Sequence, residues 1–343
     1  MADSPHTGEV AVQVHGDGAA PGETGARMSR QHTRWVEASA LPLLFLIVVV
    51  VFGVIEPSTF ISIGNAASVF GTNTVLLLVT AAVLLPLILG EFDLSVGAVA
   101  GLSAMVTATV NVEYHLPILL AVLVALAAVA MVGALNALLI VLFDNNSFIV
   151  TLAMGTAVTG IVYWISASET ISGTSAAFST WVFGNTLLGI PLEFYYGLAI
   201  MLVAWYVLEM TPLGQRMTFV GQSRAVATLS GIRVRRIRVL TFIAAALIAG
   251  LAGAVQVGTA GSANPTNGPD LLLPAFAAAF LGSTTIRPGR SNVAGAVIAV
   301  YFLAVGIDGL ELLGVQNYVH DIFYGVALVV AVTSSQLLKR RFR

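Results

Sequence analysis

Residues 90–97 of the sequence read GEFDLSVG and place two carboxylates, Glu91 and Asp93, between two apolar runs. The run before them is VLLLVTAAVLLPLIL (75–89), and the run after them consists mainly of small residues. A charged side chain inside hydrocarbon is costly, so acids at such a position indicate chemistry, a substrate contact or a break in the backbone. The remainder of the sequence helps to decide among these three interpretations.

The composition predicts an all-α, polytopic transmembrane bundle. Hydrophobic residues make up 57% of the chain and charged residues 9%, whereas a soluble domain carries roughly a quarter charged residues. A chain of 343 residues supplies about ten helices of roughly twenty residues, the length needed to cross a bilayer. The apolar stretches predict spans over 36–55, 69–90, 94–111, 116–143, 148–166, 192–210, 239–259, 271–283, 292–313 and 319–338.

The positive charges predict the orientation of these spans. Every Lys and Arg precedes the first span, lies between the sixth and seventh or between the eighth and ninth, or follows the last. With ten spans, all of these places fall on one side, which the positive-inside rule assigns to the cytoplasm. We therefore expect a disordered cytoplasmic tail over 1–35, a transmembrane domain over 36–338 with a cytoplasmic loop at 211–238, and a basic cytoplasmic end at 339–343.

No enzyme active site is recognisable in the sequence. A phosphate-binding P-loop needs a lysine inside a glycine-rich loop, and the only lysine is Lys339, four residues from the end. The sequence has no cysteine, no H-E-x-x-H motif and no G-x-S-x-G motif. We expect no catalytic residue, no metal site and no nucleic-acid partner. An ion-coupled carrier remains an alternative, although most of the carboxylates near the spans lie at span ends.

Asp93 has a local structural explanation, but Glu91 does not. Asp is a preferred N-cap, and its side chain accepts from the free amides of a helix that we expect to begin at Leu94 or Ser95. Those amides are costly if they are left unpaired in hydrocarbon. Gly97 and Gly101 then form a small-residue face that allows another helix to approach closely. Capping does not account for the second acid, at position 91.

The largest basic loop, TPLGQRMTFVGQSRAVATLSGIRVRRIRVL (211–240), contains a predicted short helix. Ser223 is its expected N-cap and Gly231 its expected C-terminal stop. The residues leave two interpretations open. The loop either fixes the membrane topology through its charge or presents a docking surface to a cytoplasmic partner.

Four blocks of sequence resemble the ribose-type permease subunits of bacterial ABC importers. GEFDLSVG is similar to the family pattern GG-x-DLSVG, and SFIVTLAMG (147–155) is similar to PFIVTLGM. VGQSRAVATLSGIRVRRIRVL (220–240) and LGSTTIRPGRSNVAGAV (281–297) resemble two further family blocks in the same order. The chain departs from the family at Glu91-Phe92, where many relatives have Gly-Ile, and at Asn146-Ser147, where many have Pro-Pro. The turn from Arg287 to Arg290 is also richer in arginine.

The resemblance implies a permease of the bacterial inner membrane that moves a monosaccharide or a similar polyol. It implies a second copy of the chain, a cytoplasmic ATPase subunit that binds ATP and Mg²⁺, and an extracytoplasmic sugar-binding protein. Permeases for branched-chain amino acids or nucleosides are the alternative within transport. The resemblance also implies a coupling helix from Gln222 to Ile232, with these positions in contact with the ATPase: Gln222, Ser223, Arg224, Ala225, Ala227, Leu229, Ser230 and Gly231.

The candidate pathway residues are polar or aromatic side chains within or beside apolar spans. An ordinary packing or hydrogen-bonding role is the alternative for each of them. The candidates are Asn73, Phe92, Asp93, Asn136, Asn146, Phe148 and Thr151, and the structural positions of the first motif are Gly90, Glu91, Ser95 and Gly97.

Overall fold

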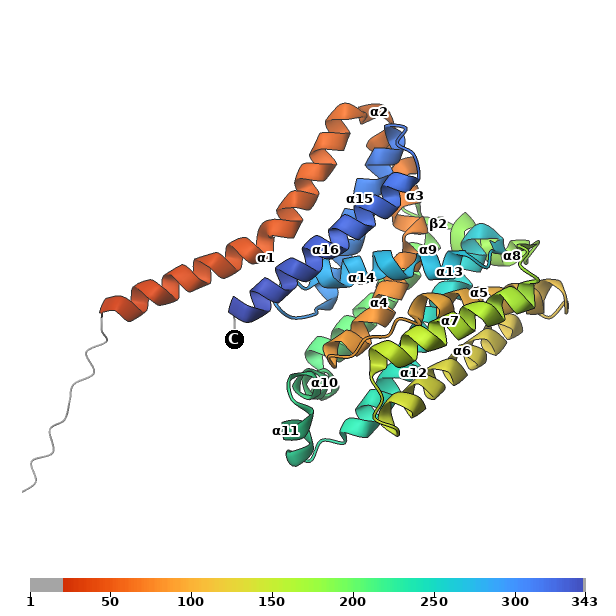
Figure 1. The fold of residues 1–343 in the computed structure, drawn as a ribbon. Helices are drawn as coiled ribbons and strands as arrows, with labels where there is room; N and C mark the ends of the chain where they lie inside the picture. Colours follow the sequence, from red (N-terminus) through yellow and green to blue (C-terminus); the bar gives the residue numbers. More distant parts are fainter. Residues whose placement is uncertain (1–20, 342–343) are drawn as a thin grey trace, which may run out of the picture.

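A computed structural model describes residues 21–341 as a bundle of helices (Figure 1). The helices of the first half are α1 (Pro21–Ile55), α2 (Pro57–Phe60), α3 (Ile63–Thr72), α4 (Thr74–Ile88), α5 (Val96–Val112), α6 (Ile118–Val141), α7 (Ser147–Ser166) and α8 (Ala176–Ser179). Those of the second half are α9 (Leu192–Trp205), α10 (Pro212–Gln222), α11 (Arg224–Leu229), α12 (Val234–Ala260), α13 (Asn267–Asp270), α14 (Leu272–Gly282), α15 (Val293–Leu312) and α16 (Tyr318–Arg341). Two π-helical turns are η1 (Thr180–Gly184) and η2 (Tyr206–Met210).

Helix α12 lies at the centre of one group of helices, where it contacts α4, α5 and α6. Its small residues allow this close packing. A Cβ atom on Gly253 would overlap the carbonyl oxygen of Ala100 in α5, and one on Gly250 would lie 2.7 Å from Val129 in α6. Small residues let helix backbones approach closely, which is how helices associate where lipid supplies no hydrophobic drive.

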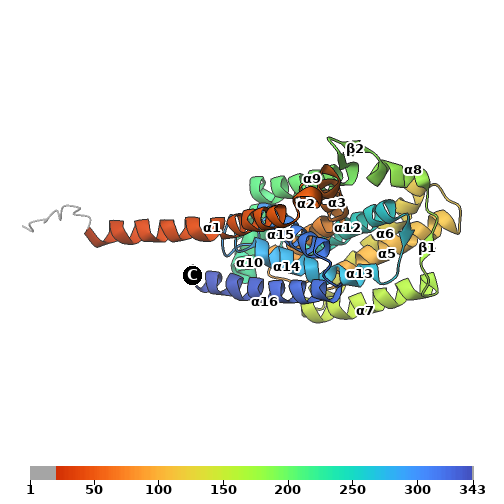
Figure 2. The ribbon, with the colours of Figure 1, turned by 90° about the horizontal axis from the view of Figure 1, so that it is seen from above.

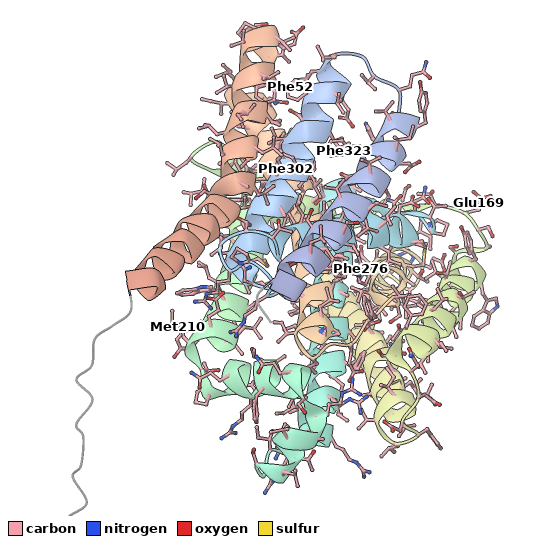
Figure 3. All side chains as sticks on the ribbon, turned by 60° about the vertical axis from the view of Figure 1, so that its left-hand side comes forward. Phe52, Glu169, Met210, Phe276, Phe302 and Phe323 are labelled. Atoms are coloured by element: carbon pink, nitrogen blue, oxygen red, sulfur yellow. The ribbon has the colours of Figure 1, made fainter. Side chains whose placement is uncertain are left out.

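A second group consists of α1, α14, α15 and α16 (Figures 1 and 2). Aromatic side chains pack between these helices, as Figure 3 shows for Phe52, Phe302 and Phe323. Phe52 of α1 lies against Gly309 of α15, and Phe323 of α16 lies against Gly306. Phe302 makes an edge contact with Phe45 at a ring-centroid distance of 6.4 Å. Helix α14 connects the two groups because it also contacts α4.

Within residues 21–341, eight helices are long and apolar enough to cross a membrane. The two remaining predicted spans, 94–111 and 271–283, correspond to the shorter helices α5, of 17 residues, and α14, of 11 residues. At about 1.5 Å per residue, α14 extends only about 16 Å. Non-helical backbone precedes α5, whereas the four-residue helix α13 precedes α14. Non-helical backbone is tolerated at membrane depth only where protein buries it.

Four short strands lie on the side of the bundle opposite α10 and α11 (Figure 1). They are β1 (Ile171–Ser172), β2 (Thr186–Leu187), β3 (Ile190–Pro191) and β4 (Ser262–Ala263). The pairs β1–β4 and β2–β3 are both antiparallel. Through the β1–β4 pair, the long loop after α7 is hydrogen-bonded to the residues that follow α12.

The ends of the chain differ from the sequence-based expectation. Residues 21–35, predicted as part of a disordered tail, belong to α1, which extends away from the bundle (Figures 1 and 2). Proline is favourable at the first position of a helix, and the Ala, Arg and Met residues that follow are good helix formers. The predicted tail over 1–20 lies outside the described residues. The last predicted span continues as α16 to Arg341.

Candidate functional site

The motif GEFDLSVG forms a break between α4 and α5, and we call residues 89–95 the interrupted segment. Gly90 has a φ of +72°, a backbone conformation that favours glycine because it has no Cβ. Glu91 donates its backbone N–H to the carbonyl of Pro86 at 3.0 Å, which closes the end of α4. The chain then runs without helical hydrogen bonds until α5 begins at Val96.

The interrupted segment leads into the bundle rather than along its surface. Glu91 at one end binds Arg238, in the first turns of α12. Beyond the other end, Ser103 of α5 donates to the carbonyl of Gly250 at 2.7 Å. Arg238 and Gly250 are twelve positions apart in α12, which corresponds to about 18 Å at the helical rise. The first residue of α5, Val96, is 1% exposed, so α5 begins inside the bundle.

Asp93 anchors the interrupted segment through a buried polar chain. Its Oδ1 accepts from the backbone N–H of Ser95 at 3.0 Å and from the Ser95 hydroxyl at 2.6 Å. The Ser95 hydroxyl in turn accepts from Asn136 of α6 at 2.9 Å. The three side chains are at most 3% exposed. Asp93 is therefore not the N-cap that the sequence predicted, since α5 begins at Val96 and its N-cap is Ser95. The short Asp side chain instead binds the backbone amide two residues on.

Helix α7 pairs two further backbone amides of the interrupted segment. Thr151 Oγ1 accepts from the N–H of Leu94 at 2.9 Å, and Ser147 Oγ accepts from the N–H of Phe92 at 3.2 Å. A Cβ on Gly155, one turn beyond Thr151, would lie 3.2 Å from the Leu94 carbonyl, so α7 approaches the segment closely. The block SFIVTLAMG therefore supplies both the acceptors and the space for the backbone of GEFDLSVG.

Phe92 belongs to an aromatic cluster, which we define as Phe92, Phe148, Phe276 and Phe280. The ring of Phe92 lies 6.2 Å from that of Phe148 in α7, 6.3 Å from Phe276 and 6.4 Å from Phe280, both in α14. Phe92 is 36% exposed and Phe148 is 47% exposed, whereas Phe276 is 6% exposed. In this cluster Phe276 is therefore buried, whereas the rings of Phe92 and Phe148 are accessible. Phe276 lies near the middle of the bundle in Figure 3.

The structure brings most of the predicted pathway residues together. Asn146 joins them as the N-cap of α7, since its Oδ1 accepts from the N–H of Phe148 at 2.9 Å. Asn73 lies elsewhere, at the opposite end of α4, where its side chain donates to the Val69 carbonyl at 2.9 Å. The length of α4, 15 residues, separates it from the others by about 22 Å at the helical rise.

Gly97 and Gly101 contact a segment far away in the sequence. A Cβ on Gly97 would lie 2.6 Å from the carbonyl oxygen of Gly268 in α13, and one on Gly101 would lie 3.1 Å from the Gly268 Cα. This is the close approach that the small-residue spacing predicts. The start of α5 therefore packs against α13, the short helix that precedes α14.

The predicted coupling helix is shorter than expected. Gln222 ends α10, an amphipathic helix that sequence reasoning missed, and α11 covers only Arg224–Leu229. Ser223 Oγ accepts from the N–H of Val226 at 3.4 Å, and Gly231 has a φ of +78°. These two residues bound α11 because Ser favours a helix N-terminus and Gly a left-handed position after its end.

Helix α11 has an apolar outer face and a buried inner face. Leu229 is 89% exposed and Val226 is 47% exposed. Ala227 is fully buried. On the remaining side, Arg224 Nη2 lies 3.1 Å from Glu91 Oε1, so its guanidinium points toward the interrupted segment. Leu229 and Val226 thus form a small exposed apolar patch on α11.

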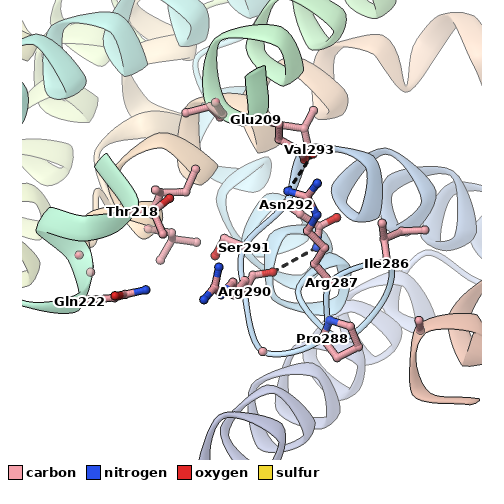
Figure 4. Close-up of a pocket in the computed structure, with 17 residues that line it drawn as sticks. Glu209, Thr218, Gln222, Ile286, Arg287, Pro288, Arg290, Ser291, Asn292 and Val293 are labelled. Carbon is pink, nitrogen blue, oxygen red and sulfur yellow. Dashed lines mark hydrogen bonds and ion pairs between the residues drawn. The ribbon is translucent and has the colours of Figure 1, made fainter. Parts of the chain in front are cut away.

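A cavity of about 760 Å³ lies beside α10 and the α14–α15 loop (Figure 4). Its walls include Gly90 of the interrupted segment and Gln222 at the end of α10. Across the cavity, Arg287 pairs with Glu209 at 3.0 Å. The arginine-rich turn at 287–290 therefore lies next to the basic loop, and we call the surface formed by 211–238 and 284–292 the basic face.

Sequence reasoning missed the contact between Glu91 and Arg238, in which Arg238 Nε donates to Glu91 Oε1. Arg238 lies one turn inside an apolar helix and is 6% exposed. A basic residue in that position signals a buried partner, because buried charges are paired. That signal was present in the sequence, but the partner was not identifiable without the fold.

The chain matches known permeases over most of its length. The family profile described as "Branched-chain amino acid transport system / permease component" matches residues 65–332. The ribose import permease protein RbsC of Bacillus subtilis is 31% identical over 290 residues, which cover 84% of this chain and 89% of that protein. The D-allose transport system permease protein AlsC of Escherichia coli is 29% identical over 297 residues, 87% of this chain and 91% of that protein.

A third relative, the fructose import permease protein FrcC of Rhizobium meliloti, is 28% identical over 318 residues, 90% of this chain and 88% of that protein. No solved structure shows a significant match to the chain. The profile covers the interrupted segment, α11 and the basic face, so the match includes every part of the site described above. The chain belongs to the family of membrane permease components that this profile describes.

Proposed function

We propose that the chain is the membrane-spanning subunit of a bacterial ABC importer for a monosaccharide or a similar polyol. Relatives that import ribose, allose and fructose are similar over 84% to 90% of its length. The observation that carries the proposal is the non-helical segment 89–95, in which Glu91, Asp93 and Ser95 are buried. Its Glu91 contacts the surface helix α11, and its Phe92 presents an accessible ring beside that of Phe148. Interrupted membrane helices are where transporters form their pathways.

Helix α11 is the proposed docking element for a cytoplasmic ATPase. Leu229 and Val226 present an apolar surface that no other described part of the chain covers. We place the basic face on the cytoplasmic side because positively charged loops stay there. In this proposal the ATPase subunit binds ATP and Mg²⁺, and this chain supplies no catalytic residue.

The proposed pathway passes the interrupted segment and the aromatic cluster. Aromatic rings offer an apolar face with a polarised edge, which suits the C–H faces of a sugar ring. Ligand sites combine such surfaces with a few placed polar groups, a role open to Asp93, Asn136 and Thr151. A second copy of the chain completes the pathway, and a binding protein delivers the sugar at the face that carries β1–β4.

Uptake by proteoliposomes tests the proposal. The vesicles contain this chain with its ATPase partner, and the binding protein is added on the opposite side with labelled ribose, allose, fructose or leucine. We expect ATP-dependent uptake of at least one sugar and none of leucine. Uptake driven by a proton or sodium gradient without the ATPase contradicts the proposal. Uptake of leucine alone assigns the chain to amino-acid transport instead.

A further inference from the structure

Glu91 is a buried carboxylate that contacts two arginines from different helices. Its side chain is 1% exposed, and its Oε1 accepts from Arg238 Nε of α12 and lies 3.1 Å from Arg224 Nη2 of α11. Its Oε2 has no hydrogen-bond partner within the described part of the chain. We call these three residues the Glu91 clamp. It connects the interrupted segment, α11 and α12 at a single oxygen atom.

The two arginines of the clamp differ in how exposed their side chains are. The Arg238 side chain is 7% exposed, whereas that of Arg224 is 45% exposed. Loss of the partner of a buried charge strongly destabilises a protein. The buried ion pair with Arg238 therefore holds Glu91 in place. The contact with Arg224 connects the carboxylate to α11.

A second contact lies next to the clamp and joins α10 to α4. A Cβ on Gly221, at the end of α10, would overlap the carbonyl oxygen of Ile88 in the last turn of α4. The end of α10, just before α11 begins, therefore packs against the last turn of α4, which leads into the interrupted segment. The neighbouring Gly90 has a φ of +72°, so the direction of the chain changes at this point.

Glu91 also directly precedes the residues of the proposed pathway. The next residue, Phe92, stacks in the aromatic cluster, and Asp93 after it binds Ser95. A displacement of Glu91 thus reaches the aromatic ring through one peptide bond. Packed side chains, ion pairs and rigid elements of this kind carry energetic coupling between sites.

We propose that Glu91 is the positioning residue that makes α11, the interrupted segment and the start of α12 move as one unit. Motion imposed on α11 from the ATPase side then reaches Phe92 and Asp93 through the Arg224–Glu91 contact. The inference rests on the proposed function, because it assigns α11 as the docking element. Capping does not explain this carboxylate, and the positioning role accounts for its burial between two arginines.

The ratio of sugar imported to ATP hydrolysed tests the inference. Glu91→Gln and Arg224→Ala are each expected to lower this ratio at least about fivefold, the lower end of typical coupling effects. A variant that only misfolds lowers import and hydrolysis together and leaves the ratio unchanged. Glu209→Gln is the matched control, since it removes the acid of the neighbouring Glu209–Arg287 pair and does not contact α11.

Two further results bear on the clamp. The double variant Glu91→Gln/Arg224→Ala is expected to be no worse than Glu91→Gln alone, because the Glu91 change already removes the contact with Arg224. An unchanged ratio in Glu91→Gln, with the wild-type complex importing sugar, overturns the inference and leaves the proposed function intact. Absence of import by the wild-type complex overturns the proposed function instead.

Hydrogen exchange in the full chain tests the mechanical connection without any partner. Arg224→Ala is expected to accelerate amide exchange in residues 89–95 as well as in α11, because the clamp joins them. Leu229→Ala is the matched control, since it alters an exposed side chain of the same helix. Unchanged exchange in 89–95 overturns the inference whether or not sugar import has been observed.

Discussion

At the residue scale, Asp93 and Thr151 perform the same task from opposite sides. Each pairs a backbone N–H of the interrupted segment, Ser95 in one case and Leu94 in the other. A buried amide without a partner costs a large part of its desolvation energy. The Asp93 carboxylate and the α7 hydroxyl therefore stabilise a non-helical backbone that lipid would not permit.

Replacement of Thr151 by valine removes an acceptor while keeping the shape of the side chain. We expect Thr151→Val to destabilise the protein by about 1–3 kcal/mol, because the Leu94 amide loses its partner. Thermal unfolding in detergent measures the change. Thr151→Ser keeps the hydroxyl and is the control, and an equal loss in both variants shows that the methyl group, not the hydrogen bond, matters.

At the element scale, short and interrupted helices carry the proposed function, whereas the long helices form the frame. The sequence predicted the capped ends of α11 because Ser223 and Gly231 are local signals. It did not predict α10 or the pairing of Glu91 with Arg224. A pairing between residues 133 positions apart depends on tertiary packing, which no local pattern encodes.

The outer face of α11 provides a prediction about partner binding. Leu229→Asp is expected to weaken ATPase association at least about tenfold, since a buried charge opposes an apolar contact. The variant remains folded, because Leu229 is 89% exposed. Pull-down of the ATPase measures the effect. Leu188→Asp, equally exposed on the opposite side of the bundle, is the control, and an equal loss in it removes α11 from the docking surface.

The packing of α12 on α5 provides a prediction about stability. Gly253→Ala is expected to destabilise the protein by about 1–3 kcal/mol, because its methyl group overlaps the α5 backbone and overpacking is costly. The control is Gly160→Ala in α7, where nothing lies within 4 Å of the added Cβ. Thermal unfolding compares the two. A neutral Gly253→Ala variant contradicts the close approach of α5 and α12.

At the scale of the whole molecule, composition and charge placement were sufficient to predict a polytopic helical membrane protein. They located the apolar segments, including the short run at 271–283 that forms α14. They did not show which helix pairs the backbone amides of the break before α5. Hydropathy measures composition and is insensitive to a break that neighbouring helices satisfy. The candidate site was likewise predictable only in part. The motifs in the sequence identified GEFDLSVG, but only the fold showed that α7, α11 and α12 contact it.

The central claim is that the interrupted segment lies on a pathway whose access alternates with ATP turnover. The chain has no cysteine, so Phe92→Cys introduces a single reactive thiol beside Glu91. Its modification by a membrane-impermeant reagent, applied from each side of proteoliposomes that contain the ATPase, is the direct measurement. Phe143→Cys, at an exposed position just beyond α6, is the control for general accessibility.

We predict that ATP shifts the side from which Cys at position 92 reacts, while the thiol at position 143 reacts from one side throughout. Identical modification at position 92 with and without ATP contradicts the account.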